Sequence, residues 1–322
     1  MQALSRDYQP VEDSLEQRLN DLERPRAHLR ELTGQTLPVR IYGSGWFHRT
    51  LPAGLALRLA ALRARLEWYA VPRRRLEAIA LTRAIRGYAD ERSARRRLVE
   101  DAVRAEVQWR PWLYRRMPVE GLEHLDEARA AGNGGLILAT IHVGAILGLV
   151  HALAARGVKL YLPGGEWGEP TVEGLRGRWI ATQNRWVEEA GARWVPLGES
   201  YPVLRALLAR GEACMLAVDV PGEVEVELAG RPARVRGGIA RLALETGSPI
   251  LPIATLRVRW GMIGFIGEPI DPAGFDDATE LTRRLVLAQS PLFLLEPEQV
   301  HALAVDVWND ELARATRPKV GR

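Results

Sequence analysis

His142 has the residue type and position best suited to acid–base chemistry in this chain. It directly follows the apolar residues 136–141, which predict a buried strand, and helical spacing resumes at residue 145. In open α/β sheets such an edge binds ligands, because the next helix offers free backbone N–H groups. A neutral imidazole there can act as a general base toward a hydroxyl, and Gly144 lets a ligand approach the backbone. The alternative is a histidine that only hydrogen-bonds to the backbone at a strand end.

Two carboxylates at predicted strand ends are candidates to support His142. Asp219 ends the apolar residues 214–219, and a carboxylate there can orient an imidazole and stabilise its protonated form. A Pro-Gly turn ending at Gly222 follows, so capping of that turn is the alternative role for Asp219. Glu166, in the loop LPGGEWGEP, is the second candidate, and its alternative is a solvated loop carboxylate.

A third feature combines arginines with a predicted helix N-terminus. Three arginines precede a pair of glycines, and helical spacing begins at the second glycine. Arginines and free N–H groups together form an anion site, which suits a phosphate or the phosphopantetheine arm of an acyl donor. The alternative is a surface hairpin whose arginines lie in water. The candidate substrate-binding residues are therefore Gly144, Glu166, Gly222, Arg231, Arg236, Gly237 and Gly238.

Predicted strands and helices alternate through the second half of the chain. The strands cover residues 136–141, 158–162, 193–195, 214–219, 223–228, 250–257 and 262–266. The helices cover residues 145–156, 171–190, 202–210, 238–246 and about 297–316. This alternation predicts an α/β fold with a mixed, largely parallel sheet flanked by helices, and a short antiparallel excursion after Asp219.

The region from Arg49 to Arg116 is strongly basic. It holds 17 arginines against seven acidic residues, a net charge of +10, whereas the whole chain carries +4. Helical spacing breaks near Pro72 and Gly87 and predicts two or three helices. In LALRLAALRARLEWYA the apolar residues and the arginines take opposite faces, which suits an anionic membrane, where each basic residue contributes on the order of 1 kcal/mol. The alternative is an ordinary helix packed on the core with its arginines in solvent.

Bulk properties narrow the class of protein. The chain divides into an N-terminal extension (1–50), an arginine-rich helical region (51–117) that faces a membrane in the first interpretation, and an α/β core (118–322). Cys214 is the only cysteine, which excludes an intrachain disulfide and a cysteine-rich metal site and fits a reducing cytoplasm. We expect no metal, no membrane span or signal peptide and, because no binding motif accompanies the arginines, no nucleic-acid partner.

Three stretches resemble, in order and spacing, the lysophospholipid acyltransferase superfamily and specifically its lipid A biosynthesis (lauroyl/myristoyl) acyltransferase branch. VEGLEHLDEARAAGNGGLILATIHVG is similar to the lead-in to the family's catalytic histidine. RGEACMLAVDVPG is similar to its aspartate-bearing strand, and GRPARVRGGIARLALETGSPILPI to its Gly-Arg-Pro segment and following helix. The resemblance runs from about Val119 to Pro252 and implies a mixed α/β sheet behind a helical part that meets the membrane.

The resemblance also implies a chemistry. Members of this family transfer an acyl group from an acyl carrier protein or coenzyme A thioester to a hydroxyl of a lipid or glycolipid. Their histidine is the general base, and an acid five residues later is its partner. Here His142 matches the histidine, but the fifth position is Leu147, and residues 143–150 include no acid. A leucine cannot fix the imidazole tautomer or stabilise an imidazolium.

Two functions therefore remain open. In the first, Asp219 or else Glu166 replaces the missing acid, and the chain is an acyltransferase bound peripherally to the inner face of the membrane. His142 is then the base, and the acyl thioester is a co-substrate with no further cofactor. In the second, catalysis is altered or lost, which leaves a lipid- or acyl-carrier-binding protein on the same fold.

Overall fold

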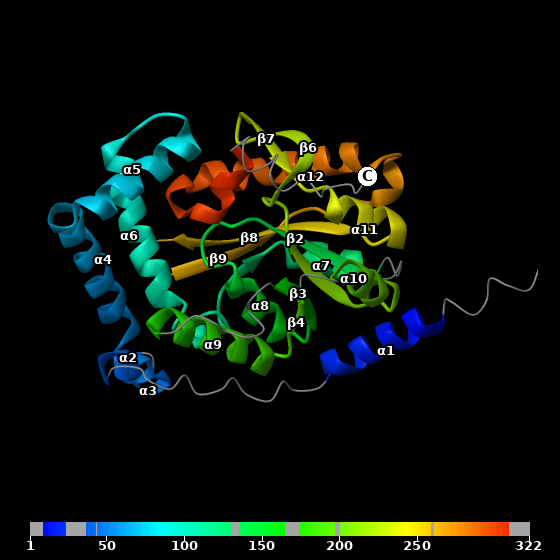
Figure 1. Ribbon diagram of the computed structural model, residues 1–322, viewed down its shortest axis with the longest axis horizontal. Helices are drawn as coiled ribbons and strands as arrows, with labels where there is room; N and C mark the ends of the chain where they lie inside the picture. The colour runs from blue at the N-terminus through cyan, green and yellow to red at the C-terminus, as the bar shows by residue number, and fades with distance from the viewer. Residues whose placement is uncertain are drawn as a thin grey trace, which may run out of the picture.

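A central sheet of seven strands organises the protein, seen here in a computed structural model that describes residues 9–23, 37–42, 44–130, 135–164, 174–196, 200–258 and 261–308. Glu166 lies outside these residues. The strands are β1 (Val119–Glu120), β2 (Leu136–Thr140), β3 (Leu160–Gly164), β4 (Arg193–Pro196), β5 (Ala213–Ala217), β8 (Ile250–Val258) and β9 (Gly261–Ile266). Their spatial order is β1-β9-β8-β2-β5-β3-β4 (Figure 1).

The sheet is mixed and largely parallel, as the alternation of elements predicts. β8 and β9 pair antiparallel, and every other neighbouring pair in this sheet is parallel. Successive parallel strands need crossover connections, and helices supply them between β2 and β3, β3 and β4, and β4 and β5. The α/β fold class inferred from the sequence is therefore confirmed.

Helices cover both faces of the sheet, and each face has its own hydrophobic core. On one face Ile137 and Leu216 pack with residues of α10 (Ser200–Ala209), α11 (Gly238–Thr246) and α12 (Ala278–Leu295). On the other, Leu138 and Met215 pack with residues of α7 (Leu122–Ala130), α8 (Leu147–Ala154) and α9 (Gly174–Glu189). Burial on both faces explains why the central strands read as continuous apolar runs instead of alternating ones.

Three helices form the arginine-rich region beside the sheet, at the left of Figure 1. They are α4 (Ala53–Ala70), α5 (Pro72–Arg86) and α6 (Glu91–Val107). Pro72 at the first position of α5 and Gly87 at φ +82° after its last turn produce the two predicted breaks. Ala64, Ala94 and Leu98 belong to a small core of their own between these helices.

The N-terminal helices bind to the rest of the chain. Leu19 and Leu22 of α1 (Gln9–Glu23) are buried, and α1 contacts α10 and β4. The short α2 (Leu37–Tyr42) and α3 (Gly45–Thr50) follow.

Across the described residues we find no helix with the length and apolar character needed to span a membrane.

A separate antiparallel hairpin follows Asp219, in agreement with the predicted excursion. It consists of β6 (Pro221–Leu228) and β7 (Arg231–Val235). Its two-residue loop, Ala229-Gly230, has φ +53° and +74°, the positive pair that a type I′ turn requires. The sequence analysis predicted β6 but missed β7.

The predicted C-terminal helix is wrong over the described residues. Residues 297–308 form two short 3₁₀ segments, η5 (Pro297–Gln299) and η6 (Ala302–Trp308), and residues 309–316 lie outside the described chain. The long helix is instead α12, which the sequence analysis missed. The sequence does mark the start of α12. Asp277 is its N-cap residue and accepts hydrogen bonds from the backbone N–H groups of Thr279 and Glu280.

Candidate functional site

The register of the sheet brings His142 and Asp219 together. β2 and β5 are parallel neighbours in which Thr140 pairs with Ala217, and the Val218 N–H donates to the Thr140 carbonyl at 2.9 Å. His142 and Asp219 each lie two residues beyond this pair, so both leave the sheet at the same carboxyl edge. Residues 77 positions apart in the chain thereby become neighbours.

Asp219 holds His142 through both carboxylate oxygens. Oδ2 accepts the backbone N–H of His142 at 2.7 Å, and Oδ1 lies 2.8 Å from the ring Nδ1. Asp219 is 2% exposed, so this clamp is shielded from water. Its oxygens are directed to His142 and not to a following turn, since Pro221 and Gly222 already belong to β6.

The clamp determines the state of the His142 ring. A carboxylate only accepts hydrogen bonds, so Nδ1 carries the proton and Nε2 keeps its lone pair. Among the described residues, none forms a hydrogen bond with Nε2, and 21% of the side chain remains exposed. Burial alone would lower the pKa of His142, but the charge and hydrogen bond of Asp219 raise that pKa above its ordinary value.

Leu147, the fifth residue after His142, is the first residue of α8 and packs in the apolar core of its face of the sheet. A leucine offers no acceptor to an imidazole. The carboxylate beside His142 therefore comes from the next strand of the sheet and not from the following helix.

A segment close to the C-terminus completes the turn around His142. The His142 carbonyl accepts the backbone N–H of His301 at 2.8 Å, and the Gly144 N–H donates to the Gln299 carbonyl at 3.0 Å. His301 Nε2 donates to the Gly144 carbonyl at 2.6 Å. Burial and the charge of Arg104 hold the pKa of His301 well below its ordinary value, so this ring is neutral. The sequence analysis did not find these residues, because no local pattern links positions 157 apart.

The structure leaves no room for a side chain at Gly144. Its φ is +60°, and a Cβ at this position would lie 1.9 Å from the Thr255 carbonyl oxygen. The protein's own strand β8 therefore already makes a close approach at this position. Any side chain here would push the His142 turn away from the sheet.

The predicted anion site does not assemble as expected. Arg231 begins β7 and Arg236 follows its last residue, so the length of the strand separates them. Arg231 instead donates to the carbonyls of Ala84 and Ile85 at the end of α5. It thus anchors the hairpin to the arginine-rich region.

The N-terminus of α11 is already occupied by a carboxylate of the chain. The Gly237 N–H donates to Glu223 Oε1 at 3.3 Å, and Arg241 contacts the same oxygen at 2.9 Å. Gly222 is required for packing, since a Cβ there would lie 2.5 Å from Arg236 Cγ. Gly238 has open space where a Cβ would be. Arg236 is exposed and uses its Nε on the Pro221 carbonyl. An intramolecular pairing thus replaces the predicted ligand at this helix end.

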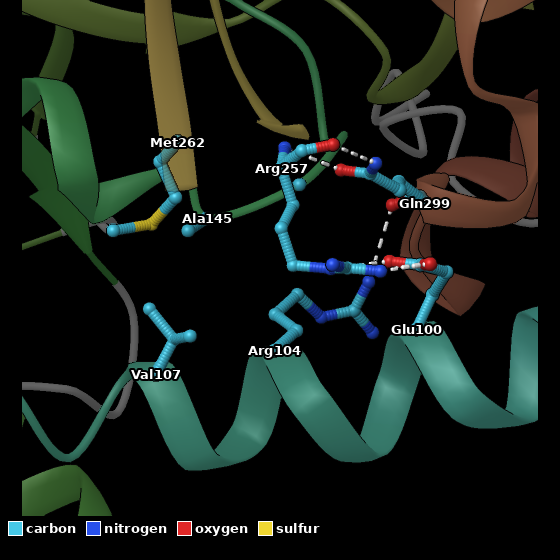
Figure 2. A pocket seen from close by; sticks show the side chains of 8 residues that line it. Glu100, Arg104, Val107, Ala145, Arg257, Met262 and Gln299 are labelled. Carbon is cyan, nitrogen blue, oxygen red and sulfur yellow. Dashed lines mark hydrogen bonds and ion pairs between the residues drawn. The ribbon is translucent and has the colours of Figure 1, made fainter. Parts of the chain in front are cut away.

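Two adjoining cavities lie beside α6, and the smaller one reaches the His142 turn. The smaller, of about 10 Å³, reaches Gly144 and Ala145. Figure 2 shows Glu100, Arg104 and Val107 extending from α6 toward this space, opposite Arg257, Gln299, Met262 and Ala145. Its volume admits about one water molecule, so it forms a constriction.

The larger cavity, of about 590 Å³, shares Val107, Met262 and three polar residues with the smaller one. Its wall combines an apolar lining with a set of arginines. The apolar residues include Leu57, Ala61, Val99, Val103, Leu113 and Met117, and the arginines are Arg65, Arg96, Arg116 and Arg257. Among the described residues, no group of three or more His, Cys, Asp or Glu side chains is arranged to hold a metal ion.

Comparisons with known proteins leave the family open. No protein-family model matches the chain, and no curated protein matches it. One solved structure similar to it is the 1-acyl-sn-glycerophosphate acyltransferase PlsC from Thermotoga maritima, at 17% identity and a TM-score of 0.36. The alignment covers 74% of this chain and 97% of that one. A likeness of this size assigns neither family nor function.

Proposed function

We propose that the chain is an acyltransferase that moves a fatty acyl group from an acyl thioester to a hydroxyl of a lipid or glycolipid. The observation that carries the proposal is the His142–Asp219 pair at the carboxyl edge of the sheet. A buried carboxylate fixes one ring nitrogen, and the other keeps a lone pair that no described residue uses. This arrangement is what a general base needs.

The proposed reaction uses His142 twice. Nε2 removes the proton of the acceptor hydroxyl while the hydroxyl oxygen attacks the thioester carbonyl carbon. The resulting tetrahedral intermediate collapses, the carbon–sulfur bond breaks, and the leaving thiolate takes the proton from Nε2. Asp219 stays ionised throughout and stabilises the imidazolium that exists between the two transfers. The products are the ester and the free thiol.

Transfer in this proposal is direct, without an acyl-enzyme. Cys214 is the only thiol, and it is fully buried inside β5. Burial and the charge of Glu212 raise its pKa to about 12, so it stays protonated near neutral pH and is a poor nucleophile. The acyl thioester is the only co-substrate that the proposal requires.

The larger cavity suits an amphiphilic, anionic substrate. Its volume of about 590 Å³ falls in the ordinary range for ligand pockets, and its apolar wall can bury part of a lipid chain. Of the arginines around it, Arg96 and Arg257 already pair with Glu296 and Glu100. Arg65 and Arg116 are therefore the ones proposed to bind phosphate or carboxylate oxygens. The constriction beside Gly144 separates it from the His142 turn, so a substrate bridging the two would have to widen this point.

An exposed apolar stripe on α4 supports docking to an anionic membrane. Its residues follow a spacing of three or four and are 48 to 66% exposed, namely Leu55, Leu59, Leu62, Leu66 and Tyr69. Arg58, Arg63 and Arg65 lie among them on the same helix. A helix packed only on its own core would bury such a stripe, whereas here a different set, including Ala60 and Ala64, is buried. We place the protein peripherally at the cytoplasmic face of the membrane.

A second candidate function is favoured by Leu147. If Asp219 does not support catalysis, the fold keeps its cavity and its membrane face but binds lipid or acyl carrier protein without turnover. A single assay, the consumption of an acyl thioester, distinguishes the two functions.

The test is consumption of an acyl thioester by purified protein in the presence of a lipid hydroxyl acceptor. Coenzyme A and acyl carrier protein thioesters are supplied in parallel, so the experiment also identifies the donor. We expect free thiol and ester in equal amounts from the wild type and neither from His142→Ala. Saturable lipid binding without thiol release would instead establish the second function.

Co-sedimentation with anionic vesicles tests the membrane proposal. We expect binding that weakens as salt rises, because the arginine contribution is screened. Leu59→Glu with Leu66→Glu should abolish binding, while Leu287→Glu, at an exposed leucine of α12, is the matched control. Absence of binding at every salt concentration would contradict docking through α4.

A further inference from the structure

The residues 296–301, called the strap below, lie between the arginine-rich helices and the turn that carries His142. On the side of the turn, strap and turn exchange three hydrogen bonds through His142, Gly144, Gln299 and His301. Val143 and Val300 form an isolated antiparallel bridge in the same place. The strap therefore pairs with the turn almost as a strand would.

On its other side, the strap is held by Arg97 of α6. This side chain is 2% exposed, and its guanidinium donates to the carbonyl oxygens of Val300, at 2.6 Å, and of Pro297. Burial lowers the pKa of Arg97 from its ordinary value. A buried cation is costly unless its donors are satisfied, so these two carbonyls are firmly held.

Further side chains of α5 and α6 hold the remaining strap residues. Glu298, buried, accepts from Arg86 at 2.6 Å and from Ser93. Arg104 donates to the Gln299 carbonyl at 3.1 Å, and Arg96 to Glu296 at 2.5 Å. Every strap residue from 296 to 300 thus has a contact with α5 or α6.

Gln299 also fastens the strap to the sheet. Its side-chain amide accepts the Arg257 N–H at 2.8 Å and donates to the Arg257 carbonyl at 2.7 Å, as strand β8 ends. The Arg257 guanidinium in turn pairs with Glu100 of α6, at 2.7 Å through Nε. Figure 2 shows this junction, with Arg257 between Gln299 and Glu100.

The turn itself has little to hold it in shape. Between residues 141 and 145 it contains one short-range backbone bond, from the Val143 N–H to the Ile141 carbonyl, and Gly144 has a positive φ. At either end of the turn, the Ile141 carbonyl also accepts from the Thr140 hydroxyl and the Ala145 carbonyl from the Gly148 N–H. The backbone of residues 142–144 is otherwise bonded to Asp219 and to the strap. If the strap shifts, the His142 ring loses its alignment with Asp219.

We propose that Arg97 and His301 are positioning residues that hold the His142 turn through the strap. The arginine-rich helices then have a structural role at the site in addition to any contact with a membrane. The effect on turnover rests on the proposed acyltransferase function, whereas the effect on the His142 ring does not.

The test is an NMR titration of the His142 ring with labelled histidine, with the kinetics measured in parallel. The variants are Arg97→Lys, His301→Leu and His301→Gln. Lysine keeps the charge but replaces the two-pronged fork with a single ammonium, and glutamine keeps an N–H donor for the Gly144 carbonyl. The control is Arg92→Lys on the same helix, since that side chain is exposed and has no contact among the described residues.

We expect the His142 pKa to fall toward its ordinary value in Arg97→Lys and His301→Leu and to stay near the wild-type value in His301→Gln and Arg92→Lys. The groups that face this ring are Asp219 and His301, with Arg104 behind His301, and Arg97→Lys changes none of their charges. Where turnover is present, kcat should fall by up to about 10²-fold with KM little changed, as expected for a misplaced catalytic group.

An unchanged His142 pKa in folded Arg97→Lys and His301→Leu would overturn the proposal. If one of the two variants fails to fold, the His142 pKa of the other tests the proposal. His301→Gln shows whether the hydrogen bond to the Gly144 carbonyl is what maintains the His142 pKa. A wild type without turnover but with the expected pKa changes would contradict the acyltransferase function and leave the positioning role intact.

Discussion

The described part of the chain contains two histidine–carboxylate pairs, and they differ in what surrounds them. His142 and Asp219 meet at the edge of the sheet, with Nδ1 and Oδ1 2.8 Å apart and 21% of the histidine side chain exposed. His48 and Glu106 meet inside the helical region, with Nδ1 and Oε1 3.6 Å apart and the histidine side chain fully buried. Among the described residues, the Nε2 of His142 has no hydrogen-bond partner, whereas the Nε2 of His48 has one.

The surroundings of His48 account for the difference. Its Nε2 donates to the Tyr42 carbonyl at 2.6 Å, and its ring stacks on Trp109 with centroids 4.8 Å apart. Glu106 is shared, since it also accepts from Tyr42 and Arg110, each at 2.5 Å. The buried His48–Glu106 pair joins α2 and α3 to α6 and is closed to substrate, whereas the partly exposed Nε2 of His142 can exchange protons with one. The pairing alone does not identify a catalytic site.

The largest expected effect is the loss of transfer in His142→Ala. Removal of a general base lowers kcat by up to about 10⁴-fold. In the matched variant His48→Ala, the folded protein should retain its kcat but unfold at a lower denaturant concentration. Thioester consumption and urea unfolding measure the two effects. Loss of kcat in folded His48→Ala would remove the distinction between the pairs.

Asp219→Asn should lower kcat by roughly 10³-fold, because an amide neither fixes the tautomer as a carboxylate does nor stabilises the imidazolium. The matched variant is Glu106→Gln, for which we expect unchanged turnover per folded molecule. Circular dichroism establishes that both proteins are folded before the rates are compared. Similar turnover in Asp219→Asn and wild type would show that Asp219 is not the missing acid.

Glu106→Gln should instead destabilise the protein by about 3–5 kcal/mol, because it leaves the buried Arg110 without its carboxylate. The free energy of unfolding, extrapolated from urea titrations, is the quantity to measure. A loss below about 1 kcal/mol would indicate that this pair does not hold α2 and α3 in place.

The same carboxylate gives the protein an acid dependence of up to about 3 kcal/mol. Burial opposes the charge of Glu106, but the nearby His48 and the hydrogen bonds from Tyr42 and Arg110 lower its pKa to about 2. A depressed folded-state pKa stabilises the fold above the unfolded value of about 4.5, and this contribution is lost as pH falls toward 2. Unfolding free energies measured across this range should therefore fall more steeply in the wild type than in Glu106→Gln. Parallel curves would contradict this assignment.

The sequence was sufficient to predict the sheet and the two residues at its edge. Apolar runs ending in His142 and Asp219 are local signals, and parallel strands bring their carboxyl ends to one edge. The sequence could not show that β2 and β5 are neighbours, because strand order depends on long-range packing.

Other parts of the site depended on contacts that no local pattern encodes. The arginines from 231 to 236 and the following glycines have the composition of an anion site, yet Glu223 occupies the helix end and Arg231 reaches α5. His301 was predicted within a helix, and only its pairing with the His142 turn reveals its place at the site. Long side chains such as arginine choose partners across the fold, so their spacing alone predicts little.

The pH dependence of kcat/KM for thioester transfer tests the role of the His142–Asp219 pair most directly. In the wild type the rate should fall as pH decreases through a midpoint above about 6.5, because the raised pKa of His142 keeps the base protonated below it. In Asp219→Asn the plateau should be lower and the midpoint should move to lower pH. Identical profiles in the two proteins would contradict a catalytic role for Asp219, and unchanged turnover in His142→Ala would contradict the base itself.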